Sequence, residues 1–326
     1  MTTILSNREK LVEIAHLYYE EGLTQQQISR RMNMSRSLVS KMLGKARSTG
    51  IVEVTIHSEI CNPHKEAEDR LRQILDLKQI KIIDAYSSGN DGTMTPFHKE
   101  VARYLSSIFL DCKTVAVSAS SNIYAAAKQM STTVSYPHMV FVPASGGLAE
   151  LGWESNANSN CSLLAEKLGA KAQQLYAPIV VESRETKDVL CAQPFIRKVL
   201  ENGRAADLAL VGVGGTFNRF SLIEDYAEEL NFNYTIDPSQ VCGDVSFNYF
   251  DRNGQPVDCE WNRMMMGLTL SDFQKIPDVI CIASEDEKAE SIYIAARHKL
   301  FTSLIITDTL ARRINEIYTR ELYRSR

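Results

Sequence analysis

A glycine-rich segment at residues 208–217, LALVGVGGTF, has the residue types that a phosphate-binding turn needs. Its apolar run breaks into Gly212, Gly214 and Gly215, and glycines at the end of a strand let the backbone approach a pyrophosphate. The dinucleotide motif G-x-G-x-x-G is incomplete because Phe217 occupies its third glycine position, and no G-K-S/T sequence follows. The segment therefore indicates either backbone room for a small ligand or a plain strand-to-loop turn.

Three other predicted strand ends carry hydroxyl, amide or ammonium groups. Such groups, together with backbone N–H groups at helix starts, bind phosphates and sugar hydroxyls. Because ligands bind beyond the carboxyl ends of the strands in parallel sheets, we expect these loops to converge on one site. The candidates are Ser118, Ser120, Ser121 and Asn122 in TVAVSASSN, Ser145, Gly146 and Gly147 in VPASGG, and Ser284 and Lys288 in CIASEDEK.

The formal charge of −4 is unevenly distributed along the 326 residues. Residues 1–50 contain eight Lys/Arg and four Glu, a net charge of +4, so the remaining residues carry −8. Between Gly22 and Gly50 there are six positive residues and no negative one. A small basic module joined to a larger acidic one is typical of a nucleic-acid-binding domain fused to another function.

The basic segment has the pattern of a helix-turn-helix. Thr24 and Gln27 have the spacing of a capping box at the start of a second helix, and Asn33 suits the left-handed conformation of a sharp turn. Ser35 can cap a third helix, whose inner face comprises Leu38, Val39, Met42 and Leu43. Its outer face is small, polar and basic, and so suits the major groove. The expected DNA contacts are Gln25, Arg31, Ser35, Arg36, Ser37, Ser40 and Lys41.

The rest of the chain predicts an α/β architecture. From about Asn62 onward, buried strand-like segments alternate with helical ones, which predicts a mostly parallel sheet flanked by helices. Asn253 and Gly254 lie between two alternating runs and predict a hairpin insertion. Residues 51–58, IVEVTIHS, alternate like the strand of a wing. We expect a winged helix-turn-helix domain over residues 1–58 and an effector-binding and oligomerisation domain over residues 59–326. A helical bundle with a solvated basic surface is the alternative for the first domain.

The composition argues against several classes of protein. The seven cysteines include no C-x-x-C pair and the six histidines lack metal-ligand spacing, so we expect reduced thiols, no metal and no cofactor. No apolar stretch approaches the roughly 20 residues of a membrane span, and the first residues lack a secretory pattern. We expect a cytoplasmic protein without membrane contact.

The order of the motifs resembles the SorC family of bacterial sugar-responsive transcriptional regulators. The resemblance runs through LYYEEGLTQQQISRRMNMSRSLVSK, TVAVSASSN, VPASGGLAE, NANSNCSLLAEKLGA, ADLALVGVGG, CGDVSFNYFDRNGQPVD and DEKAESIYIAARH. It implies a body similar in fold to sugar-phosphate isomerases, a phosphorylated sugar as effector, and a homodimer or homotetramer. It maps phosphate contacts onto Ser118–Asn122 and Ser145–Gly147, and sugar contacts onto Gly214, Gly215, Asp244 and Lys288. The chain departs from the family's W-G-x-T pattern in the first loop, where it has Ala119 in place of the glycine.

These observations favour a regulator of a carbohydrate-utilisation operon that binds double-stranded operator DNA under the control of a phosphorylated sugar. The alternative is an isomerase- or deaminase-like enzyme fused to a DNA-binding head. The sequence shows no D-G-A-D-like carboxylate pair, and Asp251, Asp258 and Glu260 are predicted to be solvated, so we expect no enzymatic activity. A recombinase would need a carboxylate triad, or a Ser or Tyr nucleophile beside arginines, and we find no such cluster.

Overall fold

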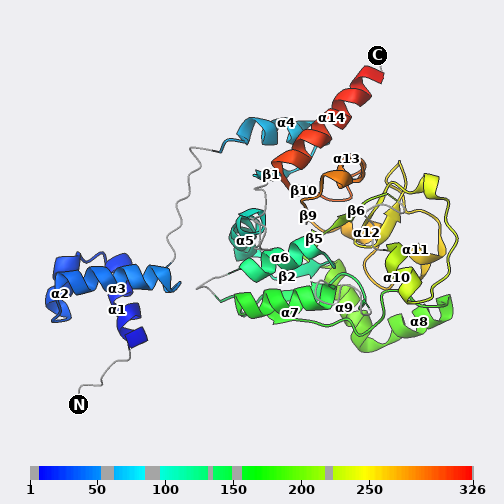
Figure 1. The fold of residues 1–326 in the computed structure, drawn as a ribbon. Coiled ribbons are helices and arrows are strands. Elements are labelled where there is room, and N and C mark those ends of the chain that lie inside the picture. The colour runs from blue at the N-terminus through cyan, green and yellow to red at the C-terminus, as the bar shows by residue number, and fades with distance from the viewer. Residues whose placement is uncertain are drawn as a thin grey trace. The chain divides into compact units, whose positions relative to one another are not determined.

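The computed structural model describes residues 7–52, 62–84, 96–130, 135–148, 156–216 and 223–324 (Figure 1). The chain divides into two compact units, which we call the head (residues 1–62) and the body (residues 63–326). The expected boundary after residue 58 and most of the predicted wing fall within residues 53–61, outside the described residues. Within the described ranges, no helix is both long and apolar enough to cross a bilayer.

The described part of the head consists of three helices around a small apolar core. The helices are α1 (Asn7–Tyr19), α2 (Gln25–Arg31) and α3 (Arg36–Ser48). The core residues are Ile14, Leu17, Ile28, Val39 and Leu43. Each helix therefore contributes at least one fully or nearly fully buried side chain, which fixes α3 against the other two.

Local backbone chemistry sets the turn between α2 and α3. Thr24 and Gln27 form the predicted capping box at the start of α2. Asn33 has a φ of 50°, the left-handed conformation that the sequence predicts. The Ser29 hydroxyl donates to the Met34 carbonyl at 2.6 Å across the turn, and Ser35 accepts from the Leu38 N–H to cap α3. The helix-turn-helix prediction is confirmed.

One predicted core position of α3 is wrong. Leu38 is 44% exposed, whereas Ala46, one turn beyond Leu43, is completely buried. The inner face of α3 therefore follows Val39, Leu43 and Ala46, at the i, i+4 and i+7 spacing of a helix stripe. Leu38 lies at the side of that stripe, next to the polar outer face.

The body is built on a seven-stranded sheet in which every neighbouring pair is parallel. The strand order is β1-β10-β9-β5-β2-β3-β4. The strands are β1 (Gln79–Ile83), β2 (Thr114–Val117), β3 (Val140–Pro143), β4 (Lys171–Ala172), β5 (Leu208–Val211), β9 (Asp278–Ala283) and β10 (Ser303–Thr307). The chain moves outward from β2 to β4, then returns to β5 and moves the other way to β10. The direction of winding therefore reverses between β2 and β5.

Helices cover both faces of this sheet, as the alternation of segments predicts. One face packs against α4 (Lys65–Leu75), α13 (Ala289–Arg297) and α14 (Asp308–Arg324), and the other against α5 (Pro96–Ile108), α6 (Ser121–Gln129) and α7 (Ala157–Leu168). Alternate residues of β5 point to opposite faces of the sheet. Ala209 and Val211 pack in the core on the α4, α13 and α14 side, and Leu208 and Leu210 pack in the core on the α5, α6 and α7 side. The expected fold class is confirmed. Figure 1 shows α4 beside α14 and α6 beside α7.

A small antiparallel sheet follows β5, and the predicted hairpin continues from its last strand. Its strands are β6 (Val213–Gly214), β7 (Gly243–Val245) and β8 (Asn248–Phe250). The β7–β8 turn is formed by Ser246 and Phe247, which have positive φ values of 48° and 64°. Asn253 and Gly254 form the next turn, where Phe250 and Pro256 are bridged and the Asp251 N–H donates to the Gln255 carbonyl at 2.8 Å. The predicted hairpin is therefore confirmed, whereas the β7–β8 turn before it was not predicted.

The remaining elements surround the small sheet and the adjoining strands. The helices are α8 (Arg184–Ala192), α9 (Pro194–Arg204), α10 (Ile223–Glu229), α11 (Glu260–Met264) and α12 (Leu270–Phe273), and the 3-10 turns are η2 (Phe109–Asp111), η4 (Pro238–Gln240) and η5 (Asp286–Lys288). Trp261 of α11 is fully buried, and its indole N–H donates to the Phe247 carbonyl at 2.9 Å. This bond holds the Ser246–Phe247 turn against the α11 layer.

Candidate DNA-binding surface and effector site

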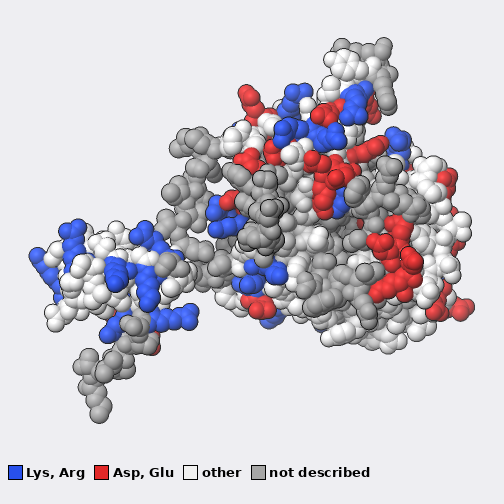
Figure 2. All heavy atoms as spheres, in the orientation of Figure 1, with Lys and Arg blue, Asp and Glu red and all other residues white. Residues whose placement is uncertain are grey.

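The outward face of α3 carries residues that the sequence predicts to contact DNA. Its exposed side chains include Arg36, Ser37, Ser40 and Lys41. Val39, on the opposite side of the helix, is completely buried. Figure 2 shows Lys and Arg side chains gathered over the head. The helix thus presents short polar side chains together with two cations, which suits close approach to a phosphate-lined groove.

The residues predicted to contact DNA differ in whether their charges already form ion pairs within the head. Arg31 Nη1 lies 2.9 Å from Glu21 Oε2, so part of its charge is already neutralised within the head. Neither Arg36 nor Lys41 lies in an ion pair with another described residue. Gln25, at the start of α2, is half-buried. Because Arg36 and Lys41 give up no ion pair on meeting a phosphate, they are the strongest candidates of the set.

In the body, most of the predicted effector residues lie where the sheet reverses direction. β2 and β5 are adjacent and parallel, so the loops that follow them leave the sheet at the same edge. Such a reversal is the usual place for a ligand crevice in an open parallel sheet. A cavity of about 70 Å³ lies there. It is lined by Ala119, Ser120, Ser121, Asn122, Gly212, Val213, Gly214, Asp244, Ser246, Phe247, Ile282 and Lys288.

Hydrogen bonds fix the loops after β2 and β5 against each other. The Gly212 N–H donates to Ser118 Oγ at 3.1 Å, and the Ser118 N–H donates to the Leu210 carbonyl at 2.9 Å. Ser120 begins α6 by accepting from the Ile123 N–H. Ser118 is completely buried, so it positions the two loops and does not itself line the cavity.

Gly214 and Asp244 form one wall of the cavity. The two residues are paired across β6 and β7, and Asp244 is only 6% exposed. Asp244 Oδ1 accepts from the Phe247 N–H at 3.1 Å. A Cβ at Gly214 would overlap Asp244 Oδ2, so glycine is needed to leave room for the carboxylate. A carboxylate in this position is a suitable acceptor for ligand hydroxyls.

Ser246 and Phe247 extend this wall and were not predicted as site residues. A non-glycine residue in the left-handed region costs about 1–3 kcal/mol, and such residues cluster at binding sites. Ser246 is 3% exposed, and its Oγ has no hydrogen-bond partner among the described residues. A ligand hydroxyl or phosphate oxygen would satisfy it. Nothing in the sequence signals this role, because neither residue favours the left-handed turn that places it here.

Lys288 is the one cation among the described residues that line the cavity. Its side chain is 17% exposed, and Nζ donates to Glu285 Oε1 at 2.8 Å. Glu285 Oε2 accepts from the Ser284 N–H at 2.9 Å and from Asn122 Nδ2 at 3.1 Å. Burial alone would raise the pKa of the Glu285 carboxyl, but the Lys288 ammonium and these donors outweigh it and hold that pKa at about 2. Glu285 is therefore ionised at neutral pH.

The predicted residues Ser145, Gly146, Gly147 and Gly215 do not line this cavity. Ser145 is fully buried, and a Cβ at Gly146 would overlap the backbone of Pro178. Gly215 is buried after β6. Close backbone packing beside β3 explains the glycine at position 146, so a glycine here reflects steric demand at this end of the sheet and not contact with this cavity.

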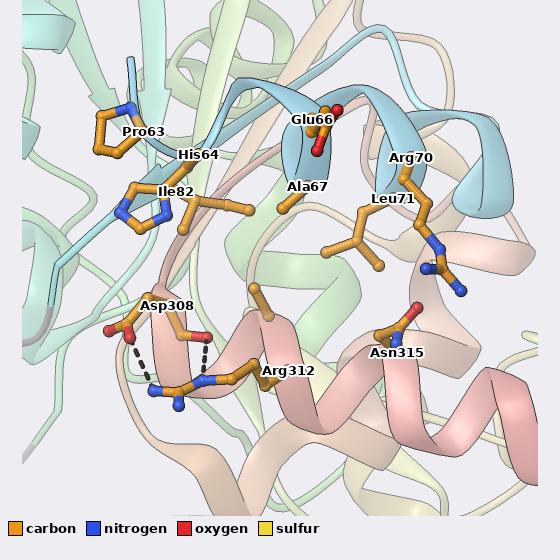
Figure 3. A pocket seen from close by; sticks show the side chains of 11 residues that line it. Pro63, His64, Glu66, Ala67, Arg70, Leu71, Ile82, Asp308, Arg312 and Asn315 are labelled. Carbon is orange, nitrogen blue, oxygen red and sulfur yellow. Dashed lines mark hydrogen bonds and ion pairs between the residues drawn. The ribbon is translucent and has the colours of Figure 1, made fainter. Parts of the chain in front are cut away.

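A larger cavity of about 500 Å³ lies elsewhere in the body, between α4 and α14 (Figure 3). Figure 3 shows Arg70 of α4 reaching toward Asn315 of α14. Arg312 of the same cavity donates to Asp308 Oδ2 at 2.7 Å. None of the predicted effector residues lies in its lining. The smaller cavity, where the loops after β2 and β5 converge, is therefore the candidate effector site, although it is not the larger of the two.

Two family models match the chain. One, described as "Putative sugar-binding domain", matches residues 61–315, and the other, "Sigma-70, region 4", matches residues 5–48. The first match spans most of the chain and contains every strand of both sheets. The chain belongs to this sugar-binding family, that of the SorC transcriptional regulators. The resemblance found in the sequence is confirmed.

Individual relatives match nearly the whole regulator. The chain is 26% identical over 325 residues to the transcriptional regulator LsrR of Enterobacter sp. (strain 638), and the match covers 95% of this chain and 94% of LsrR. It is 25% identical over 311 residues to the deoxyribonucleoside regulator of Bacillus subtilis (strain 168), covering 92% of this chain and 95% of the relative. These relatives are transcriptional regulators, so the regulator function predicted from the sequence is confirmed.

Solved structures show the same fold. The DeoR family transcriptional regulator from Listeria monocytogenes has a TM-score of 0.68 and 26% identity, covering 78% of this chain and 100% of that chain. The full-length sorbitol operon regulator SorC from Klebsiella pneumoniae has a TM-score of 0.71 and 20% identity, covering 95% of this chain and 99% of that chain. The second likeness concerns the fold alone.

We predict that Gly214→Ala destabilises the body, because the added methyl group overlaps the Asp244 carboxylate. Overpacking of this kind costs about 1–3 kcal/mol. Gly147→Ala is the matched control, since the nearest atom to its added Cβ, the Ala177 carbonyl oxygen, lies 3.7 Å away. Urea denaturation measures both free energies of unfolding, and equal values for the two variants would contradict the close fit of Gly214 and Asp244.

Proposed function

We propose that this regulator controls a carbohydrate-utilisation operon and that a phosphorylated sugar, bound between the loops after β2 and β5, changes its affinity for operator DNA. The observation that carries the proposal is a cavity at the reversal of the sheet in which Lys288 meets the first turn of α6. The name of one relative, a deoxyribonucleoside regulator, and the description of the matched family as a sugar-binding domain support a sugar-derived effector.

The head binds operator DNA with α3 in the major groove. Arg36 and Lys41 contact phosphates or guanine edges, while Ser37 and Ser40 let the helix backbone approach the bases. Ser35 fixes the start of the helix, and Gln25 and Arg31 contact the flanking backbone. Helix-turn-helix proteins bind two half-sites as dimers, which supports a homodimer or homotetramer acting in the cytoplasm.

The effector binds with its phosphate at the start of α6 and its hydroxyls toward β7. Ser120, Ser121 and Asn122 surround the positive end of the α6 dipole, which favours an anion. Lys288 supplies the compensating charge. Asp244 and the backbone of Gly214 contact the sugar hydroxyls, together with Ser246 Oγ, which has no hydrogen-bond partner among the described residues.

The body acts by binding and not by catalysis. An isomerase needs a positioned acid and base beside the reacting carbons. Asp258 and Glu260 pair instead with Arg263, and Asp251 accepts from the backbone N–H groups of its own turn. The effector changes DNA affinity only if it binds one arrangement of the oligomer more tightly, and couplings of about 5–150-fold are typical.

We predict that Arg36→Ala and Lys41→Ala each weaken operator binding at least tenfold, because each removes a charged contact to the duplex. Arg184→Ala is the control, since Arg184 is an exposed cation on α8 of the body. Gel shifts at fixed salt, with a duplex selected from a random library by the wild-type protein, measure the affinities. Wild-type affinity in both head variants would reject α3 as the recognition helix.

We predict that Lys288→Ala abolishes the rise in melting temperature that a phosphorylated sugar causes, because the anion loses the one side-chain cation among the described residues of the cavity lining. The screen uses glucose 6-phosphate, fructose 6-phosphate and ribose 5-phosphate against their unphosphorylated sugars. Lys275→Ala, an exposed lysine before β9, is the control.

A rise that survives in Lys288→Ala would move the effector site elsewhere in the body. Incubating the full-length protein with each sugar phosphate and analysing the products tests the non-catalytic role. Turnover of any of them would support the enzyme alternative.

A further inference from the structure

Glu285 lies beside the proposed phosphate site with a charge that opposes the ligand. Lys288, the cation of the cavity lining, is already paired with Glu285 at 2.8 Å. Asp244 adds a second, nearly buried carboxylate to the same site. A phosphate monoester carries a charge of about −1.5 to −2 at neutral pH. The free site therefore offers this ligand no net positive charge, and binding requires the Lys288–Glu285 pair to change.

The hydrogen bonds of Glu285 show which side of the pair can be released. Its Oε1 accepts from Lys288, whereas Oε2 accepts from the Ser284 N–H at 2.9 Å and from Asn122 Nδ2 at 3.1 Å. Glu285 keeps these donors when Lys288 leaves, so its carboxylate remains satisfied. Lys288 has no other acceptor among the described residues, and at 17% exposure it needs an anion.

The anchoring groups come from two separate elements of the sheet edge. Ser284 follows β9, and Asn122 lies in the first turn of α6. Asn122 is itself held, because its Oδ1 accepts from Ser284 Oγ at 2.9 Å and lies 2.9 Å from His98 Nε2 on α5. The Glu285 carboxylate is thus fixed in place. The Lys288 ammonium group, by contrast, lies at the end of its own flexible side chain and pairs with Glu285 alone among the described residues.

We propose that Glu285 is a carboxylate latch that sets the affinity of the site for phosphate: it neutralises Lys288 in the free regulator, and the phosphate of the effector displaces it from the ammonium group. This inference rests on the proposed function, since it concerns the same cavity. A neutral sugar leaves the Lys288–Glu285 pair intact, so the latch affects only anionic ligands. Glu285 thereby keeps weakly binding anions out of the site.

We predict that Glu285→Gln binds inorganic phosphate and ribose 5-phosphate at least tenfold more tightly than the wild type, because a neutral amide competes poorly with a phosphate for Lys288. Binding of ribose is expected to stay unchanged. Glu287→Gln is the matched control, since Glu287 is an exposed carboxylate two residues further along the chain. Isothermal titration of the full-length protein measures the affinities, and unfolding without ligand checks that each variant is folded.

Phosphate affinity in folded Glu285→Gln that equals or falls below the wild-type value would overturn the latch and leave the proposed function standing. Absence of phosphate and ribose 5-phosphate binding in both proteins would contradict the phosphate site itself, and the latch with it. If Glu285→Gln does not fold, Glu285→Asp replaces it. The shorter side chain draws the carboxylate away from Lys288, so a smaller gain in phosphate affinity is expected and an unchanged affinity overturns the latch.

Discussion

The hydrogen bond from the Gly212 N–H to Ser118 Oγ joins the ends of β2 and β5 at the point where the sheet reverses direction. Both candidate ligand loops begin within a few residues of this bond. α6 follows from the Ser118 side, and β6 follows from the Gly212 side and brings Asp244 across from Gly214. A fully buried hydroxyl with a backbone partner thus determines where the two sides of the cavity meet, which are the proposed binding sites of the phosphate and of the sugar hydroxyls.

Local signals in the sequence were sufficient for the fold and for part of the site. The Thr24 capping box and the left-handed Asn33 depend on neighbouring residues alone, so the helix-turn-helix could be predicted, as could the alternating strands of the body. The strand-end loops with Ser120 and Gly214 follow from topology, because parallel strands end at one edge. Lys288 was predicted from the segment that follows β9, whereas Asp244 came from the family resemblance, and both lie in the cavity.

The rest of the site depends on contacts between distant segments. Ser246 and Phe247 adopt positive φ values that neither residue favours, and a buried Trp261 holds them there, so no turn signal marks them. Gly146 was predicted to belong to a ligand loop because a glycine is required both where two backbones pack closely and where a backbone approaches a ligand. In the structure, Gly146 packs against the backbone of Pro178. A count of charged residues also does not show which side chains pair. Arg31 and Lys288 each form an ion pair with a carboxylate, and neither pair was predicted from the sequence.

The opposite net charges of residues 1–50 and of the remaining chain have a consequence for counterions. Each DNA phosphate neutralised by a Lys or Arg releases condensed cations and contributes about −0.9 to the slope of log affinity against log salt. Eight Lys/Arg in residues 1–50 limit the contribution of the head to that slope to about −7. The acidic remainder repels the duplex, so sliding along non-specific DNA depends on the head. Ionic strength therefore sets how long the regulator searches before it dissociates.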